Sequence, residues 1–291
     1  MYEGDLNYLR EQQEYMRALL RVLASQMDGD RENLQGGQRL LDWPTSQMPD
    51  VIHAGYQALM VMAMEAGAEI GGWLGDRQMQ SECRGALRRL RRHVPDHLRN
   101  KQAAAMLVLA GLADPGKVCR TVIARGGAEG FSTFYGYYML EALAEGGLYD
   151  EALQIISDYW GAMLDLGATT FWEDLNYAHA AGAARIDEPV PAGKFDIHAE
   201  SGAYCYKGLR HSLCHGWASG PTPWLSRHVL GIVPLEPGCK SVAVRPHLGH
   251  LKWAEGTFPT PWGVIRVRHE RGADGKVSTS VSAPDGVRVV R

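Results

Sequence analysis

Hydrophobic residues recur every three or four positions through most of the first 165 residues, which is the period of amphipathic helices. Glycine, proline and aspartate interrupt the pattern at short intervals, so consecutive helices are expected to be antiparallel neighbours. The predicted helices cover approximately the following residues: 5–27, 52–70, 76–93, 99–112, 115–125, 131–145 and 148–164.

The segment 52–70 is rich in alanine and methionine and is apolar on nearly every side. Helices of this kind are usually buried between other helices. Pro44 disfavours a helix through the preceding loop, and Asp50 is expected to cap the helix at its start. This half of the chain is therefore predicted to be a run of helical hairpins, for which an open solenoid and a closed ring fit equally well.

The pattern changes after residue 173. Residues 174–210 show little periodicity, and a loop of this length is often functional. One more helix is predicted at 213–230, interrupted at Gly220-Pro221. From Pro234 onward apolar and polar residues alternate between turn signals, which predicts a small antiparallel β unit. The chain is thus expected to be mainly α with a β tail, in two domains, 1–233 and 234–291.

Composition narrows the range of functions. The 291 residues carry a net charge of -3, which gives no electrostatic footprint for nucleic acid or an anionic membrane. No apolar run approaches the roughly 20 residues that span a bilayer. The five cysteines lie far apart, so neither a disulfide framework nor a metal site is expected. Reduced thiols and a polar N-terminus without a signal peptide indicate the cytoplasm, although a longer parent chain would also be compatible with the periplasm or secretion.

The segment Gly167–Glu173 offers the clearest candidate chemistry. Glu173 directly follows Trp172 in a turn between two helical patterns. Sites that cleave sugars combine an aromatic face, which contacts the apolar face of a sugar ring, with a carboxylate that handles protons. The alternative is a glutamate in the first turn of a helix, stabilised by the helix dipole.

The second candidate is the stretch from His211 to Thr222. His211 and His215 are four residues apart, but no carboxylate lies between them as in a zinc protease, so no metal is expected. A neutral His215 beside Trp217 is suited to donate a hydrogen bond to a sugar hydroxyl. The alternative is a pair of histidines that bond to backbone groups at a packed helix end.

Two weaker candidates add carboxylates. Asp42-Trp43 would form a stacking platform with a carboxylate that holds hydroxyls, or else simply a loop fixed by a buried tryptophan. The segment from Asp196 to Glu200 would supply a second acid from the long loop, or else be a polar surface. An aromatic stripe at 131–138 fits a core better than a site.

Four phrases combine into a family resemblance: LDWPTS (41–46), GATTFWED (167–174), GLRHSLCHGWASGPTPWLS (208–226) and VLGIVPLEPG (229–238). In this order they resemble the family-78 glycoside hydrolases, the α-L-rhamnosidases. The stretches PHLG (246–249) and WAEGTFPTPWG (253–263) resemble the small β-sandwich that follows the catalytic domain there.

The resemblance implies an (α/α)6 barrel and inverting hydrolysis of terminal α-L-rhamnosides, without a cofactor. The family's general base corresponds to Glu173 and its substrate-contacting histidine to His215. The sugar-stacking tryptophan corresponds to Trp43, with Trp172 and Trp217 completing an aromatic wall. Asp42 would join His215 in fixing sugar hydroxyls. The partner would be a rhamnose-containing glycoside or polysaccharide.

The chain departs from the family in one respect. The family's general acid lies in a motif well before the DW element, and only about 40 residues precede Asp42 here. We therefore expect an incomplete barrel that resembles the C-terminal part of a rhamnosidase and lacks the general acid, with Asp196 and Glu200 as the available substitutes. Such a chain would be inactive or slow alone, and would associate with itself or with a missing N-terminal half.

Two other functions fit the sequence. A carbohydrate-binding or scaffold protein would keep the aromatic wall without the acid. Another glycosidase, or a polysaccharide lyase on the same helical barrel, would need basic residues in the site, for which Arg185, Lys194 and Lys207 are available.

Overall fold

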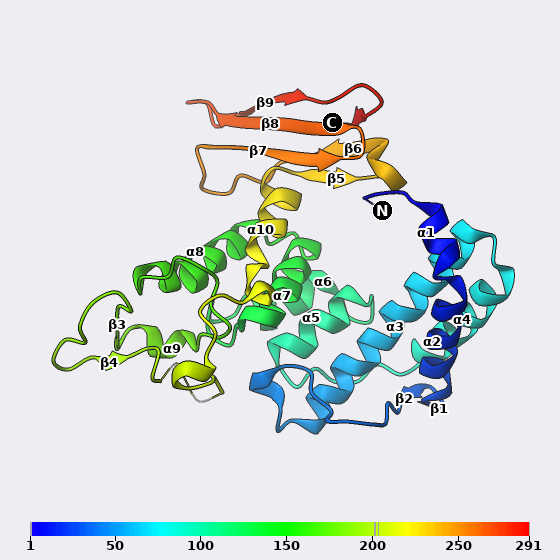
Figure 1. Cartoon of the computed structure of the whole chain (residues 1–291), viewed down its shortest axis with the longest axis horizontal. Helices are drawn as coiled ribbons and strands as arrows, with labels where there is room; N and C mark the ends of the chain where they lie inside the picture. The colour runs from blue at the N-terminus through cyan, green and yellow to red at the C-terminus, as the bar shows by residue number, and fades with distance from the viewer. Residues whose placement is uncertain (1, 201, 203, 291) are drawn as a thin grey trace. The chain divides into compact units, whose positions relative to one another are not determined.

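The computed structural model describes residues 2–200, 202 and 204–290. The chain divides into two compact units: residues 7–219, and residues 220–291 together with residues 1–6. The first is mainly helical and the second contains two small sheets, which confirms the prediction of a helix-rich chain with a β tail (Figure 1).

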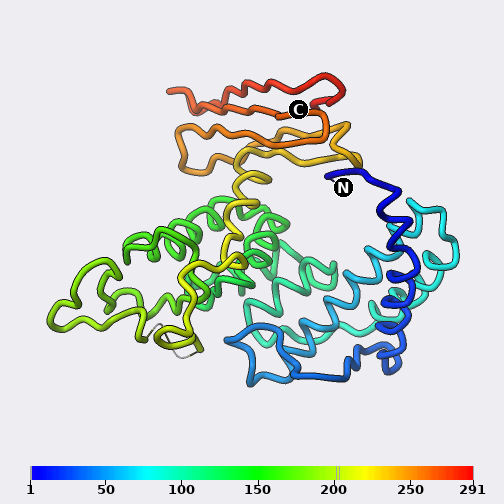
Figure 2. The backbone as a smooth tube through the Cα atoms, in the orientation of Figure 1, coloured from blue at the N-terminus to red at the C-terminus, as the bar shows by residue number. Residues whose placement is uncertain are grey.

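The helical unit is a succession of helices in which neighbours along the chain pack together. Helix α3 packs against α4 and α5, α5 against α7, and α7 against α8, as the tube in Figure 2 also shows. The helices are α1 (Leu6–Glu11), α2 (Gln13–Ser25), α3 (Pro49–Leu74), α4 (Arg77–Leu90), α5 (Lys101–Leu109), α6 (Pro115–Val118), α7 (Thr133–Glu145), α8 (Tyr149–Asp165) and α9 (Tyr177–Ala180).

Short strands and turns connect these helices. Strands β1 (Met27–Asp28) and β2 (Arg31–Glu32) form an antiparallel hairpin, and β3 (Ala183–Ala184) pairs in parallel with β4 (Phe195–Asp196). Helix α6 continues into the π-turn η2 (Cys119–Ile123), so the helix predicted at 115–125 changes its hydrogen-bond pattern halfway.

The long helix α3 shows how local chemistry sets its ends. It begins at Pro49, whose missing N–H costs nothing in the first turn, and Asp50 lies exposed in that turn without a capping bond. The predicted cap at Asp50 is therefore wrong. The helix ends at Gly75, which adopts the left-handed conformation with φ of 70°. Asp76 then caps α4 by accepting the Met79 N–H at 3.0 Å.

The helix predicted at 213–230 is also wrong in its first half. Residues just after Ser212 form backbone hydrogen bonds with the segment that carries Glu173, so they are not free to be helical. Helical structure appears later: the 3-10 turn η4 (Gly216–Ser219), α10 (Pro221–Trp224) and the π-turn η5 (Leu225–Val229). Pro221 stands at the first position of α10, where proline is favoured.

The second unit contains two three-stranded sheets. One has the order β10-β6-β5 and the other β7-β8-β9. Their strands are β5 (Ile232–Pro234), β6 (Ser241–Val244), β7 (Trp253–Thr260), β8 (Gly263–Arg271), β9 (Val277–Ser282) and β10 (Arg288–Val290).

Both sheets contribute to one buried core, as in a sandwich. Ile232 and Val242 come from the first sheet, and Ile265 and Val267 from β8 of the second. The unit is not fully antiparallel as predicted, because β10 pairs with β6 in parallel, from Arg288 opposite Ser241. The reason is that β10 returns from the far end of the second sheet and joins the open edge of β6.

We predict that Asp76→Ala lowers the free energy of unfolding by about 1–3 kcal/mol. Asp76 is buried, caps α4, and accepts hydrogen bonds from Arg17 at 2.5 Å and Gln13 at 2.8 Å, which joins α2 to α4. Urea denaturation measures the change. Asp50→Ala is the matched control and should stay within about 0.5 kcal/mol of the natural chain, because the Asp50 side chain is exposed. Equal effects of the two substitutions would contradict the assignment.

Candidate functional site

The two predicted motif segments lie side by side and are joined by backbone hydrogen bonds. The N–H of Glu173 donates to the carbonyl of Ser212 at 2.8 Å, and the N–H of His215 donates to the carbonyl of Phe171 at 2.8 Å. The hydroxyl of Thr170 adds a bond to the carbonyl of Leu213. Because these bonds run in both directions, they fix the register in which Glu173 faces the histidine segment.

A sharp turn places the first segment. Helix α8 ends at Asp165, and Gly167 follows with φ of 91°, a conformation that residues with a Cβ rarely adopt. A Cβ at Gly167 would also lie 2.9 Å from the Asp187 side chain. Glycine at this position therefore lets the chain turn away from α8 toward the site.

Glu173 is nearly buried, with a side chain 7% exposed. Its Oε2 accepts the N–H of Ser212 at 3.0 Å and lies 3.9 Å from Nδ1 of His215. Its backbone carbonyl accepts the indole N–H of Trp217 at 2.8 Å and the hydroxyl of Thr133. The backbone of Glu173 is thus fixed by two side-chain donors, and its carboxylate is oriented by the Ser212 N–H on Oε2.

An aromatic platform lies beside this carboxylate. The His215 ring is 4.2 Å from the Trp217 ring between centroids, and Phe134 stacks on Trp217 at 5.2 Å with an interplanar angle of 20°. The side chain of His215 is 30% exposed, and Phe134 is 37% exposed. The predicted pair of Glu173 and His215 is therefore brought together, next to rings that solvent can reach.

Trp172 does not join the platform. It is 1% exposed, and its indole N–H has no partner among the described residues. A ring buried to this extent cannot stack on a sugar, so its predicted place in an aromatic wall is wrong for this structure. Because side chains of consecutive residues in an extended segment point to opposite sides, Trp172 fills the core while Glu173 faces the histidine segment.

Asp42 is placed differently from the expectation as well. It caps the short turn η1 (Trp43–Thr45), and Oδ1 accepts the N–H of Trp43 at 2.9 Å. Its Oδ2 accepts the Ser132 hydroxyl at 2.6 Å and the Gln102 amide at 3.2 Å. The carboxyl is 3% exposed, and burial raises its pKa. Protein donors therefore occupy the group that was expected to hold sugar hydroxyls, and its role here is to fix the loop to α5 and α7.

Trp43 remains a half-buried ring. The Trp43 ring meets the Tyr206 ring edge-on, with 5.7 Å between the ring centroids. The guanidinium of Arg210 lies over the Tyr206 ring, 4.3 Å from its centroid. Its sugar-stacking role stays a prediction.

Asp174 is the site residue that sequence reasoning missed. It is 3% exposed, and its Oδ2 has no partner among the described residues. Burial first, and then the neighbouring charges of Asp42 and Glu173, raise its pKa to about 8. The ring of His211 bonds to the Asp174 backbone carbonyl at 2.9 Å, and burial lowers the pKa of that histidine. The sequence signal that could have identified Asp174 is the pair of consecutive carboxylates that ends the phrase GATTFWED.

The remaining candidates lie on the loop whose His198 ring stacks on His211, with 6.2 Å between the ring centroids. Asp196 and Glu200 are exposed, and Asp196 Oδ1 accepts the N–H of His198 within its own loop at 2.9 Å. In the part of the chain that the structure describes, no group of three or more His, Cys, Asp or Glu side chains is arranged to hold a metal ion. No helix in this part is long and apolar enough to cross a membrane.

We predict that the contribution of Asp174 to stability falls as pH rises from about 4 to 8, because folded Asp174 must keep a proton that the unfolded chain releases near pH 4. A carboxyl group whose pKa is raised by folding stabilises the folded chain fully below its unfolded pKa. This stabilisation is lost as the pH rises to the folded pKa. Asp174→Asn should therefore flatten the profile by about 1–3 kcal/mol between pH 5 and 8, measured by chemical denaturation.

The exposed Asp165 gives the control, since Asp165→Asn should leave the slope unchanged. A profile of Asp174→Asn with the same slope as that of the natural chain would rule out a protonated Asp174.

The comparisons with known proteins agree with this fold. Residues 231–290 match the family described as the bacterial alpha-L-rhamnosidase C-terminal domain. No curated protein matches the chain in sequence.

Solved α-L-rhamnosidase structures are similar over 99% of this chain. That of Streptomyces avermitilis, in complex with L-rhamnose, has a TM-score of 0.76 and 20% identity, with 27% of that chain covered. The GH78 rhamnosidase of Bacillus sp. GL1 has a TM-score of 0.76 and 20% identity, with 31% covered. That of Aspergillus terreus has a TM-score of 0.72 and 15% identity, with 34% covered.

The chain therefore spans about a third or less of the length of these enzymes. The resemblance drawn from the sequence motifs is confirmed: residues 231–290 match a rhamnosidase C-terminal domain, and the chain as a whole has the fold of the C-terminal part of family-78 α-L-rhamnosidases.

Proposed function

We propose that this chain forms part of an α-L-rhamnosidase-type hydrolase, in which Glu173 is the general base that activates water for inverting release of terminal α-L-rhamnose. The single observation that carries this proposal is the geometry of Glu173, held between the Ser212 N–H and His215 beside half-exposed aromatic rings. The fold shared with rhamnosidases, one of which was solved with L-rhamnose, supports the same substrate class.

The residues of the chain divide the proposed reaction between them. The Ser212 N–H bonds to Oε2 of Glu173, with His215 3.9 Å from the same oxygen, and the carboxylate takes a proton from a water molecule. That water attacks the anomeric carbon from the face opposite the leaving group, so the configuration inverts. His215 donates to a sugar hydroxyl, and the Trp217 and Phe134 rings pack against the apolar face of the sugar.

We propose that the general acid is supplied from outside this sequence. Asp196 and Glu200, the substitutes within the chain, are exposed. Asp174 would hold a proton at neutral pH but is buried away from solvent. A natural glycoside, whose leaving oxygen needs a proton, would therefore react slowly with this chain, whereas an activated aryl α-L-rhamnoside needs little acid help.

We predict that Glu173→Ala lowers turnover of an activated aryl α-L-rhamnoside by about 10² to 10⁴-fold, because the attacking water loses its base. Azide needs no deprotonation, so added azide should restore turnover of this variant and give the β-configured rhamnosyl azide. Leaving-group release and product configuration, followed by absorbance and NMR, measure both effects.

Glu188→Gln, at an exposed glutamate of the loop after α9, is the matched control and should keep normal turnover. Full activity of Glu173→Ala would refute the assignment of the base. An α-configured azide product would refute inversion.

The helical unit would be an incomplete (α/α)6 barrel that associates through α3. The residues of α3 that face α4 and α5 are fully buried, but a second stripe of apolar residues along the same helix is only half-buried: Leu59, Met62, Ile70 and Trp73. In a complete barrel further helices would cover such a stripe. The occupant would be a second copy of the chain or the helices of a missing half.

We therefore expect self-association at micromolar concentration, measured by analytical ultracentrifugation. Met62→Glu should shift the chain toward monomer by placing a charge in the apolar contact, while Glu65→Gln should not. A natural chain that sediments as a monomer at all concentrations would contradict this.

A sugar-binding protein without turnover is the second candidate. The observation in its favour is the nearly buried position of Glu173 beside an accessible His215 and Phe134. Binding of L-rhamnose by the natural chain with no turnover of the activated rhamnoside would favour this function over hydrolysis.

A further inference from the structure

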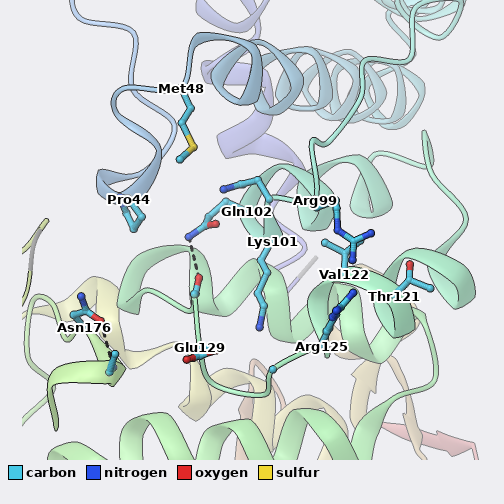
Figure 3. A pocket seen from close by; sticks show the side chains of 14 residues that line it. Pro44, Met48, Arg99, Lys101, Gln102, Thr121, Val122, Arg125, Glu129 and Asn176 are labelled. Carbon is cyan, nitrogen blue, oxygen red and sulfur yellow. Dashed lines mark hydrogen bonds between the residues drawn. The ribbon is translucent and has the colours of Figure 1, made fainter.

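A large cavity lies next to the candidate site in the helical unit. Its volume is about 880 Å³, and its walls come from the turn after Trp43, the start of α5, the segment after η2 and the start of α9 (Figure 3). Gln102 links this wall to the loop that carries Trp43, because its amide donates to Asp42 at 3.2 Å and to the carbonyl of Gly130 at 3.3 Å. Asn176, on the opposite wall, follows the acidic segment by two residues.

The cavity is positively charged although the chain is not. Arg99, Lys101 and Arg125 line it against a single carboxylate, Glu129, whereas the whole chain carries a net charge of -3. Figure 3 shows Arg99 and Arg125 close together beside Thr121 on one wall, with Lys101 reaching along the middle. Cations gathered in a concave surface raise the local concentration of anions.

The two arginines have no internal counter-ion. Both are exposed, and within residues 2–200, 202 and 204–290 neither guanidinium forms an ion pair. By contrast, Arg17 and Arg21 of α2 each pair with a carboxylate of α4 or its cap. Two like charges on one wall repel each other, and an anion between them would relieve that repulsion.

Lys101 adds a cation that the fold holds inside the cavity. Its ammonium donates to the Gly127 carbonyl at 2.8 Å and lies 5.1 Å from the centre of the Phe131 ring. Burial lowers the pKa of this lysine to about 8, so an anion nearby would stabilise its charged form. Lys101 is also the first residue of α5, where the helix dipole favours negative charge.

The other residues that line the cavity indicate which chemical groups a bound anion would carry beside its charge. The cavity offers polar side chains that can bond to hydroxyls, namely Asn100, Thr121 and Asn176, and the residues that line it include no aromatic ring. An aromatic aglycone would be expected to meet aromatic walls, as in most apolar ligand sites. A hydroxyl-rich ligand with a carboxylate fits this lining better.

We propose that this cavity is a binding subsite for a carboxylate-bearing sugar, with Arg99 and Arg125 holding the carboxylate, so that the substrate is an acidic glycan. The assignment rests on the proposed function, because it takes the neighbouring Glu173 site to bind the terminal rhamnose. The guanidinium fork suits a planar carboxylate, which accepts two parallel hydrogen bonds.

The test measures binding of tri-galacturonate to the 291-residue chain by calorimetry at low and at physiological salt. The natural chain should bind it with an affinity that falls with salt, and a neutral tri-galactoside should bind at least tenfold more weakly. The double variant Arg99→Ala, Arg125→Ala should lose at least tenfold in affinity. Arg84→Ala, Arg88→Ala removes the same charge from α4 and should change the affinity less than twofold.

Three outcomes would overturn the proposal. The first is equal binding of the acidic and the neutral trisaccharide. The second is equal loss in the two double variants, which would show a general effect of net charge. The third is sulfate binding as tightly as the uronate, which would mark a site for small inorganic anions rather than for a sugar.

L-Rhamnose binding in the same variants separates this proposal from the proposed function. The double variant at Arg99 and Arg125 should bind L-rhamnose normally, whereas His215→Ala should lose rhamnose binding and keep uronate binding. Rhamnose binding without any uronate binding would overturn the subsite alone. Uronate binding without any rhamnose binding would refute the function proposed for Glu173 and leave the anionic sugar site standing.

Discussion

The candidate site depends on the pair of backbone hydrogen bonds between the segments around Glu173 and His215. These bonds join residues about 40 positions apart, at Glu173 to Ser212 and at His215 to Phe171. Without them, the loop that carries His215 would have no fixed register against the end of α8. The position of the Glu173 carboxylate follows from this pairing. The carbonyl of Ser212 accepts the Glu173 N–H, and the N–H of Ser212 donates to the Glu173 carboxylate.

The second constraint is electrostatic. Asp42 and Asp174 are buried with raised pKa values, and Asp174 lies close enough to Asp42 and Glu173 for their charges to raise its pKa further. Burying carboxyl groups near one another is costly, and in enzymes such arrangements concentrate at functional sites. Hydrogen bonds from Ser132 and Gln102 offset part of this cost at Asp42, and no donor does so at Asp174 Oδ2 among the described residues. The folded arrangement of the site is therefore stabilised by the surrounding residues rather than by interactions among its own carboxylates.

The sequence was sufficient for features that depend on local patterns. The long apolar helix, the change to strands after residue 230 and the proximity of Glu173 to His215 were all predictable, the last from the motif resemblance. Features that depend on distant partners were not. The segment after Ser212 pairs with another loop instead of starting a helix, and β10 joins β6 in parallel. Likewise, nothing local shows that Trp172 turns inward or that Asp42 is already bonded by two other helices' residues.

The cysteines differ in their exposure to solvent, and the exposed one lies beside the site. Four of the five thiols are buried, and Cys214 alone is exposed, between Ser212 and His215 in the paired segment. Burial also raises the pKa of Cys83, Cys119 and Cys239, which keeps those thiols protonated and unreactive. Alkylation or oxidation of the folded chain would therefore begin within one residue of His215. The same thiol is a natural attachment point for a spectroscopic label that reports on occupancy of the site.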